Sequence, residues 1–286
     1  MAIPQNNGLL QVFNVDHGAC ALLTIPTPYG ARRIMIDSGH SAEYLGRPWH
    51  PGRHLANLGV GHLDLLVCTN YDEDHASGFP SLMEHGISIG CILGNPTVPP
   101  GVIVQLKTFD GMGPGIRTLA HVMETRRQQG HVEVVPDIPG VELTWAWNPW
   151  PHWDSENNLS LVLRVRVADT TFLFTGDMER DGFNNLLLHP TFASWMSGIH
   201  VLMAPHHGRE NGRCPALFDL HGCNPQLIVI SDCAKRHQSQ ETVPYYASKA
   251  TGVRGVRRFD DMRYVMTTRS DNEILFHWEG ARCIVS

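Results

Sequence analysis

The sequence lacks the cysteine patterns that mark disulfide-stabilised proteins and thiolate metal clusters. Its cysteines are odd in number, and no two of them form a C-x-x-C pair. A disulfide framework usually needs an even number of cysteines, and a thiolate zinc site usually shows paired spacing. We therefore expect reduced, mostly buried thiols in a cytoplasmic protein at the seven positions, which are Cys20, Cys68, Cys91, Cys214, Cys223, Cys233 and Cys283.

The sequence also lacks long apolar runs and an excess of positive charge. The first residues do not combine a basic region with an apolar stretch, and no later run is apolar enough to span a bilayer, so we expect no export and no membrane partner. The net charge of −6 and the pI near 6.3 argue against a protein that coats nucleic acid over its whole surface. Any site for a polyanion must be local.

No repeat of solenoid period, low-complexity tract or linker interrupts the chain. Its 286 residues are 42% hydrophobic and 17% charged, a composition that supports one large core and argues against disorder. We predict a single domain over residues 1–286, built from two pseudo-symmetric halves at about 1–140 and 141–286.

Strand-like and helix-like segments alternate along the chain, which predicts an α/β fold of packed sheets with helices outside. Strands are predicted at 9–15, 19–25 and 33–37 as an opening meander, then at 63–69, 87–93, 132–135, 141–147, 159–165, 171–175, 199–204 and 227–231. Helices are predicted within 48–61 and at 77–86, 111–130, 183–188, 191–196 and 243–251, and a closing hairpin is predicted from 263–268 and 273–278.

Polar clusters follow four of these apolar runs. Asp37 ends one run, and Asp72, Asp74 and His75 follow another; Asp177 and the pair His206 and His207 follow two more. Strand ends on one edge of a sandwich can converge, and clustered carboxylates and imidazoles are costly unless a cation compensates them. Taken singly, these residues also fit ordinary roles as a helix N-cap, a turn residue and exposed loop histidines. Taken together, they indicate a metal site.

The segment Thr69–Gly78 resembles the H-x-H-x-D-H signature of metallo-β-lactamases, and in particular the S-H-x-D-x-D-H-x-G-G variant found in the corresponding domain of ComEC-type DNA-uptake proteins. Further matches keep the family's order: Val15–Ala21 resembles its V-G-Q-G-D-A, Ile36–Gly39 its I-D-T-G, Asn157–Leu163 its N-N-x-S-L-V-L, Phe174–Asp177 its L-T-G-D, and Ala204–Gly208 its V-P-H-H-G. The resemblance covers about residues 9 to 240.

This resemblance implies a four-layer αββα sandwich with a divalent metal site. Asp177 would bridge two metal ions, and the other ligands would be Asp72, Asp74, His75 and His206. The sequence departs from the common signature at three positions: Asp72 replaces its second histidine, Asn70 its first, and Asn158 lies near its third-motif histidine. These harder donors favour Mn²⁺ or Mg²⁺ relative to Zn²⁺, although two histidines keep Zn²⁺ open, and the site would hold one or two ions.

Other residues receive supporting roles. By the resemblance, His237 is the family's late histidine and would protonate a leaving oxygen or contact a substrate phosphate, with Lys235 and Arg236 beside it; the alternative is an exposed loop histidine. His207 would orient its neighbour or act in catalysis beside Asp74, and Asp37 would hold a ligand histidine. His17 and His152 are weaker candidates.

The leading functional hypothesis is a metal-dependent phosphodiesterase or nuclease that uses metal-bound hydroxide on a nucleic acid or nucleotide. A basic C-terminal segment would contact the phosphate backbone, or else form a solvated face paired with acids; its residues are Lys249, Arg254, Arg257, Arg258, Arg263 and Arg269. One alternative is hydrolysis of a small-molecule ester, lactone or thioester in a pocket walled by the tryptophans at 145, 147, 150 and 153. Another is a non-catalytic binding module. A homodimer and a larger partner protein both remain open.

Overall fold

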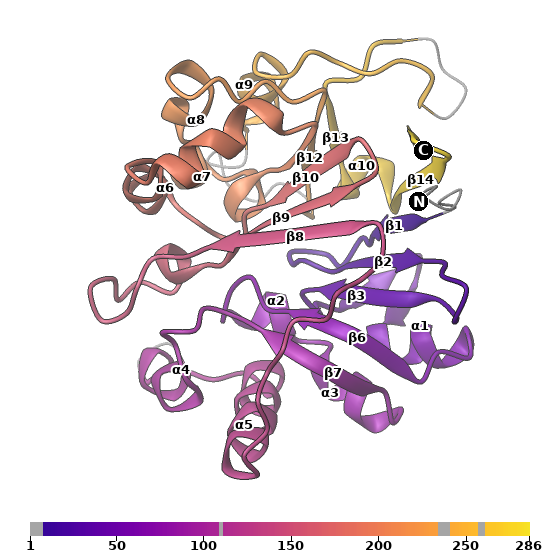
Figure 1. The fold of residues 1–286 in the computed structure, drawn as a ribbon, viewed down its shortest axis with the longest axis vertical. Coiled ribbons are helices and arrows are strands. Elements are labelled where there is room, and N and C mark those ends of the chain that lie inside the picture. The colour runs from indigo at the N-terminus through magenta and orange to yellow at the C-terminus, as the bar shows by residue number, and fades with distance from the viewer. Residues whose placement is uncertain (1–7, 109–110, 234–240, 257–260) are drawn as a thin grey trace.

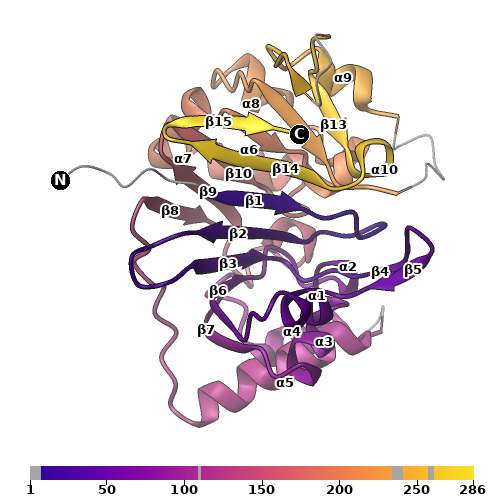
Figure 2. The same cartoon turned by 90° about the vertical axis from the view of Figure 1, so that its right-hand side faces the viewer.

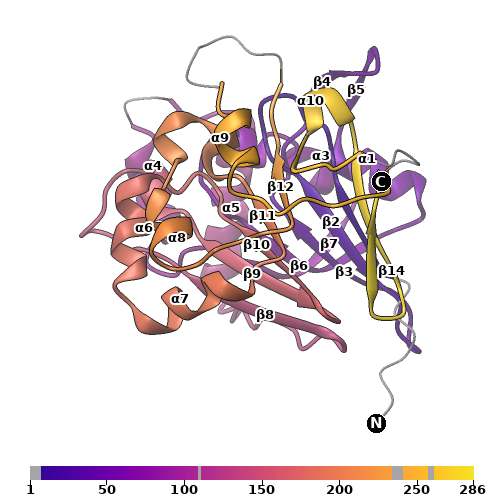
Figure 3. The ribbon, with the colours of Figure 1, turned by 90° about the horizontal axis from the view of Figure 1, so that it is seen from above.

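Two β-sheets packed face to face form the centre of the protein, as seen in a computed structural model that describes residues 8–108, 111–233, 241–256 and 261–286 (Figure 1). Helices cover the outer face of each sheet. Seen from above, α6, α7 and α8 lie on one side of the sheets and α1 on the other (Figure 3). The predicted four-layer αββα architecture is confirmed.

The first sheet contains seven strands in the order β15-β14-β1-β2-β3-β6-β7, which Figure 2 shows from top to bottom. The opening meander β1-β2-β3 is antiparallel, as predicted, whereas β3, β6 and β7 run parallel. The strands are β1 (Leu9–Val12), β2 (Ala21–Ile25), β3 (Arg32–Ile36), β6 (His62–Val67), β7 (Ser88–Leu93), β14 (Ile274–Glu279) and β15 (Arg282–Val285). A separate small hairpin is formed by β4 (Ser41–Tyr44) and β5 (Arg47–Trp49).

The second sheet contains six strands in the order β13-β12-β11-β10-β9-β8. Strands β8, β9 and β10 are antiparallel, and β10 to β13 are parallel. The strands are β8 (Val141–Ala146), β9 (Val162–Val167), β10 (Thr170–Phe174), β11 (Val201–Met203), β12 (Leu227–Ile230) and β13 (Val265–Thr267). Both sheets thus place a set of parallel strands beside one another.

The helices bury one apolar face against a sheet. The first sheet is covered by α1 (Pro51–Asn57), α2 (Glu73–Ala76), α3 (Phe79–Glu84), α4 (Pro100–Leu106) and α5 (Pro114–Gln128). The second is covered by α6 (Arg180–Leu187), α7 (Pro190–Trp195), α8 (Pro215–Asp219) and α9 (Val243–Ala247). A further short helix, α10 (Thr268–Asp271), follows β13, and single 3₁₀ turns are η1 (Asn157–Leu159), η2 (Met196–Gly198), η3 (Pro205–Gly208) and η4 (Glu210–Gly212).

Three apolar cores correspond to the three interfaces between the layers. The central core lies between the sheets and includes Phe172, Phe276 and Trp278, whose rings pack edge to face. The other two cores lie between each sheet and its helices. Five of the seven cysteines are buried. In the described residues, no helix combines the length and apolarity needed to cross a bilayer.

Two predicted elements are wrong. Residues 132–135 form no strand; Val132 is 74% exposed, and Glu133 holds the segment beside β7 by accepting a hydrogen bond from the backbone N–H of Ile92 at 2.8 Å. The predicted closing hairpin also fails. Its first strand, β13, pairs with β12 in the second sheet, and α10 then carries the chain to the first sheet, where β14 pairs with β1 and β15.

Candidate metal centre

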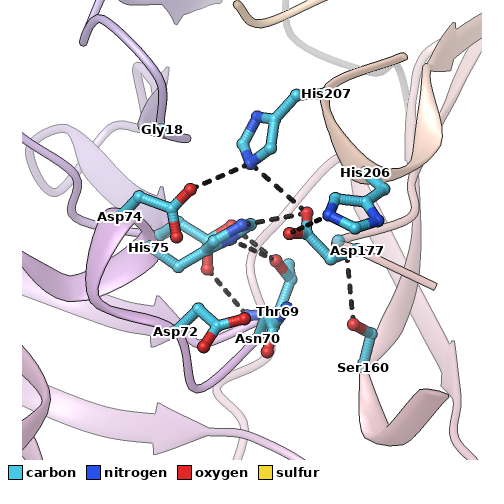
Figure 4. Close-up of polar contacts among 12 residues, drawn as sticks. Gly18, Thr69, Asn70, Asp72, Asp74, His75, Ser160, Asp177, His206 and His207 are labelled. Atoms are coloured by element: carbon cyan, nitrogen blue, oxygen red, sulfur yellow. Dashed lines mark hydrogen bonds and ion pairs between the residues drawn. The ribbon is translucent and has the colours of Figure 1, made fainter. Parts of the chain in front are cut away.

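The ends of five strands bring polar residues to one edge of the sandwich. Asp37 follows β3 and residues 69–75 follow β6 in the first sheet, while Asp177, the pair 206–207 and Ser231 follow β10, β11 and β12 in the second. Because the carboxyl ends of parallel strands share one sheet edge, residues far apart in sequence meet there (Figure 4). The candidate site therefore lies between the two sheets.

Four side chains, one each from Asp74, His75, Asp177 and His207, form the centre of this site. One donor atom from each lies within 4.8 Å of the donor atoms of the other three. Nε2 of His75 lies 3.0 Å from Oδ1 of Asp177, and Nε2 of His207 lies 3.2 Å from Oδ2 of Asp74 and 3.5 Å from Oδ1 of Asp177 (Figure 4). Asp74, with 30% of its side chain exposed, is the member that reaches solvent.

Hydrogen bonds outside the cluster set the orientation of both imidazoles. Nδ1 of His75 lies 2.9 Å from Oδ2 of Asp37, and Nδ1 of His207 lies 2.9 Å from the carbonyl oxygen of Ser231. A carboxylate and a carbonyl both accept, so each Nδ1 donates, and each Nε2 faces the cluster, where it would offer its lone pair to a metal ion once deprotonated. Nε2 of His207 is buried without a hydrogen-bond partner among the described residues. Two imidazole lone pairs and two carboxylates that converge in this way fit a divalent cation.

The carboxylates of the cluster favour positive charge on the histidines around them. Burial alone would lower the pKa of His75, but the carboxylates of Asp177 and Asp37 raise it well above its ordinary value. Burial alone would also lower the pKa of His207, but the carboxylates of Asp177 and Asp74 raise it. Although burial would raise the pKa of Asp177, the histidines around it lower it. The same carboxylates that raise the histidine pKa values would attract a divalent ion.

Close backbone approaches position Asp74. The backbone N–H of Ala19 donates to the carbonyl oxygen of Asp74 at 3.3 Å, and a Cβ on Gly18 would collide with that same oxygen. A Cβ on Gly39 would lie 2.6 Å from it. Glycine at these two positions therefore allows the segment that carries Asp74 to pack against the loops after β1 and β3.

The pair His206 and His207 has a backbone conformation that non-glycine residues rarely adopt. Their φ values are 49° and 52°, in the left-handed region, and Gly208 follows with 71°. Each such residue costs about 1–3 kcal/mol and is usually retained at a functional site. This turn directs His207 into the cluster, whereas Nε2 of His206 lies 3.7 Å from Oδ2 of Asp177.

Three predicted site residues have other partners. The carboxylate of Asp72 pairs with the ammonium of Lys107 and lies outside the cluster. Oδ1 of Asn70 accepts from the backbone N–H of Tyr71 at 2.5 Å, and Oδ1 of Asn158 accepts from that of Gly182 at 3.0 Å. Among the described residues, the four-membered cluster thus contains His207 in place of the expected Asp72 and His206.

Other predicted residues lie at the border of the site, away from it or outside the described residues. His17 borders the site, with its ring centroid 4.7 Å from that of His207, and burial together with His207 and Arg209 lowers its pKa to about 4. His152 is exposed. His237, Lys235 and Arg236 lie outside the residues that the structure describes, so their predicted roles stay predictions.

The predicted basic segment and tryptophan wall have ordinary packing roles in the described structure. Lys249 pairs with Asp219, Arg263 with Asp271 and Arg269 with Asp232, while positions 257 and 258 are not described. Trp145 and Trp147 pack on the central core, and Trp150 and Trp153 pack on the core beneath the first set of helices.

The sequence did not predict three residues that lie near the site. Nη1 of Arg209 lies 3.3 Å from Nε2 of His206, and its other terminal nitrogen contacts His17. Oε1 of Glu179 lies 3.7 Å from Nδ1 of His206. Lys107 is buried against Asp72. Arg209 and Glu179 each lie two residues after a cluster residue, a spacing that signals proximity, whereas Lys107 lies in no motif.

Comparisons with known proteins find two sequence relatives. The chain is 24% identical over 234 residues to ComE operon protein 3 of Bacillus subtilis (strain 168), covering 77% of this chain and 28% of that protein. It is 24% identical over 233 residues to competence protein ComA of Neisseria gonorrhoeae, covering 80% and 28%. The chain therefore spans just over a quarter of the length of these relatives. No family model matches.

Solved structures with a similar arrangement include a diphosphatase of the PhnP family, with 9% identity, a TM-score of 0.41 and coverage of 96% of this chain and 99% of that one. Another is CmlA, a diiron β-hydroxylase from Streptomyces venezuelae, with 14% identity, a TM-score of 0.44 and coverage of 79% and 45%. Together with the motif order, the sequence relatives confirm the predicted resemblance to the metallo-β-lactamase superfamily.

Proposed function

The chain has the fold of the metallo-β-lactamase hydrolase superfamily, and we propose that it is a metal-dependent hydrolase of phosphodiester bonds in a nucleic acid or nucleotide. The observation that supports this most strongly is the convergence of Asp74, His75, Asp177 and His207, with Nε2 of both imidazoles directed inward. Mixed carboxylate and imidazole donors suit Mn²⁺ or Zn²⁺.

A divalent ion bound by these four residues would supply a Lewis acid and lower the pKa of water. The protein contributes orientation and proton transfer. Asp37 and the Ser231 carbonyl fix the two imidazoles, so the site is ordered before substrate binds. Asp74 is the carboxylate that reaches solvent, and this exposure supports a role as acceptor of the proton from an attacking water.

The support for an anionic substrate comes from Arg209. Its guanidinium contacts the rings of His17 and His206 at the border of the site, and within the described ranges no carboxylate forms an ion pair with it. The pKa of His206 is lowered by burial, so this ring is a neutral acceptor that orients Arg209 without neutralising it. A guanidinium beside a metal site that pairs with none of the described carboxylates suits a phosphate oxygen, because its planar fork matches that group.

The sequence relatives also favour a nucleic acid as substrate. One of them is a competence protein by name, and the motif order of this chain resembles the domain of DNA-uptake proteins. Because the chain covers 28% of each relative, we propose only the local hydrolytic reaction and not the activity of a whole competence protein.

The test is turnover of purified protein with Mn²⁺ or Zn²⁺ on single-stranded DNA, double-stranded DNA, RNA and bis-p-nitrophenyl phosphate, with p-nitrophenyl acetate as a neutral ester. We expect cleavage of at least one phosphodiester, lost in Asp177→Asn and kept in Asp219→Asn, which removes a carboxylate from the exposed pair with Lys249. Turnover of the neutral ester alone would instead support an esterase. Bound metal without turnover of any substrate would support a binding module and overturn the proposal.

A further inference from the structure

A buried lysine lies beside the candidate metal site. The side chain of Lys107, which follows α4, is 6% exposed, and its Nζ contacts the carboxylate of Asp72 and lies 3.1 Å from Oε1 of Glu156. Burial alone would lower the pKa of Lys107, but Asp72 and Glu156 raise it, so the ammonium is charged. A buried charge of this kind is costly unless its partners are fixed. Its burial distinguishes this ammonium from an ordinary surface charge.

The acid that holds Lys107 lies beside the metal cluster in the chain. Asp72 directly precedes α2, the short helix that carries Asp74 and His75, and its carboxylate contacts the ammonium of Lys107. The ammonium of Lys107 supplies the positive charge on that side.

The residues on the Asp72 side do not fit a second metal ion. The amide oxygen of Asn70 accepts from Tyr71, and that of Asn158 accepts from Gly182. The amide nitrogen of Asn158 lies 3.4 Å from Oε2 of Glu179, in position to donate. The carbonyl oxygens of both amides thus accept from the backbone, and the carboxylate of Asp72 is paired with Lys107.

His206 does not complete a second site either. Its Nε2 lies 3.7 Å from Oδ2 of Asp177, and its Nδ1 lies 3.7 Å from Oε1 of Glu179. The two ring nitrogens point in different directions, so one ion cannot take both of them, and Nη1 of Arg209 lies 3.3 Å from Nε2, where a second ion would face the guanidinium.

We propose that the site takes one divalent ion, held by Asp74, His75, Asp177 and His207, and that the ammonium of Lys107 is a built-in second cation that neutralises Asp72 and Glu156. This inference rests on the proposed function for the identity of the site and specifies its metal content. Lys107 acts through Asp72 and is a positioning residue, not a metal ligand.

The experiment measures metal content by native mass spectrometry and Mn²⁺ paramagnetic resonance on the intact chain. We expect one ion per wild-type chain and the spectrum of an isolated Mn²⁺. Asp72→Asn should keep one ion with a Kd changed less than about threefold, because Asp72 is not a ligand, whereas Asp177→Ala should lose it. Lys107→Met should bind a second, weaker ion on the freed carboxylates, and Lys107→Met combined with Asp72→Asn should return to one.

Lys249→Met is the matched control, since that ammonium pairs with exposed Asp219, and it should keep one ion. Two ions in the wild type, loss of the ion in Asp72→Asn, or a folded Lys107→Met that still binds one ion would overturn the inference. If Lys107→Met does not fold, the wild type and Asp72→Asn decide the outcome. Metal content is read separately from turnover, so one bound ion without hydrolysis would contradict the proposed function and leave the ion count intact.

Discussion

Nδ1 of His75 lies 2.9 Å from a carboxylate oxygen of Asp37, a residue 38 positions earlier in the chain. The same carboxylate accepts from the backbone N–H of Thr69 at 2.7 Å and from its hydroxyl at 2.5 Å. Asp37 therefore fixes both the imidazole and the loop that precedes it. Its own backbone has a φ of 56°, so the loop after β3 holds a conformation that side-chain-bearing residues rarely adopt.

We predict that Asp37→Asn weakens divalent metal binding by about 10–100-fold, the size of effect usual for a partner that orients a ligand histidine. The amide keeps the shape but removes the charge that favours Nδ1–H on His75. Titration with Mn²⁺ measures the Kd. Asp64→Asn is the control, because it also removes a buried carboxylate. Asp64 pairs with Arg32 and lies near the start of β6, whereas the metal site follows the end of that strand. Equal losses in both variants would show a general effect of destabilisation.

Removing the metal should lower stability. The four donors converge on the ion only in the folded state. Metal binding therefore adds RT ln(1 + [M]/Kd) to the free energy of unfolding, or about 2.7 kcal/mol at a free metal concentration of 100 times Kd. Urea unfolding of chelator-treated protein, with and without added Mn²⁺, measures this difference. The stability of Asp177→Ala should not respond to metal; a response equal to that of the wild type would mean that the ion binds elsewhere.

Metal affinity should rise with pH. The pKa values of His75 and His207 are raised in the metal-free protein, because the neighbouring carboxylates outweigh burial, so both rings carry protons that the ion must displace. We expect release of about one to two protons per ion near neutral pH, measured by calorimetry in buffers of different ionisation enthalpy. Affinity independent of pH between 6 and about 8 would contradict this.

The same shifts set the pH dependence of stability in the metal-free protein. A histidine whose pKa is higher in the folded state than its unfolded value of about 6.5 stabilises the protein. This stabilisation is fully present at pH values below about 6.5. This contribution is lost as the pH rises through the folded pKa of His75 and of His207. Chelator-treated protein should therefore become less stable from pH 6 toward about pH 9, and saturating metal should reduce this loss.

Much of the site could be predicted from strand ends. Asp74, His75 and Asp177 each follow an apolar run that becomes a buried strand, and the parallel arrangement brings these ends together. The choice between His206 and His207 could not be predicted, because it depends on two consecutive left-handed residues whose φ values no local pattern specifies. Lys107 was missed for a different reason. It lies at the end of a short helix, and only the tertiary packing of α4 places it against Asp72.

The misassigned strand at 132–135 and the misassigned closing hairpin also show where local patterns fail. The alternating valines near residue 132 suit a strand, yet a side chain and not a backbone ladder holds that segment at the sheet. The closing hairpin was predicted because its two strands are neighbours in the sequence, but β13 and β14 belong to different sheets. Sequence proximity favours pairing only as a tendency, and the sandwich overrides it here.

The contact between Gly18 and Asp74 should be sensitive to one methyl group. A Cβ at position 18 collides with the carbonyl oxygen of Asp74, so Gly18→Ala must displace the segment that carries a metal donor. We expect a loss of about 1–3 kcal/mol in stability, together with weaker metal binding. Unfolding and metal titration should be measured on the same samples. Gly61→Ala is the matched control, because its Cβ would meet nothing within 4 Å.

Arg209 provides the sharpest test of the substrate class. If its guanidinium binds a phosphate oxygen, Arg209→Ala should raise KM for a phosphodiester at least about tenfold, since hydrogen bonds to charged groups contribute roughly 1.5–3 kcal/mol. Arg209→Lys should recover only part of this, because an ammonium lacks the planar fork. Arg127→Ala removes an exposed arginine paired with Glu124 and should change nothing. Hydrolysis of a neutral ester, where present, should be insensitive to Arg209. Equal losses on charged and neutral substrates would mean that Arg209 supports the fold of the His206–His207 turn and does not recognise charge.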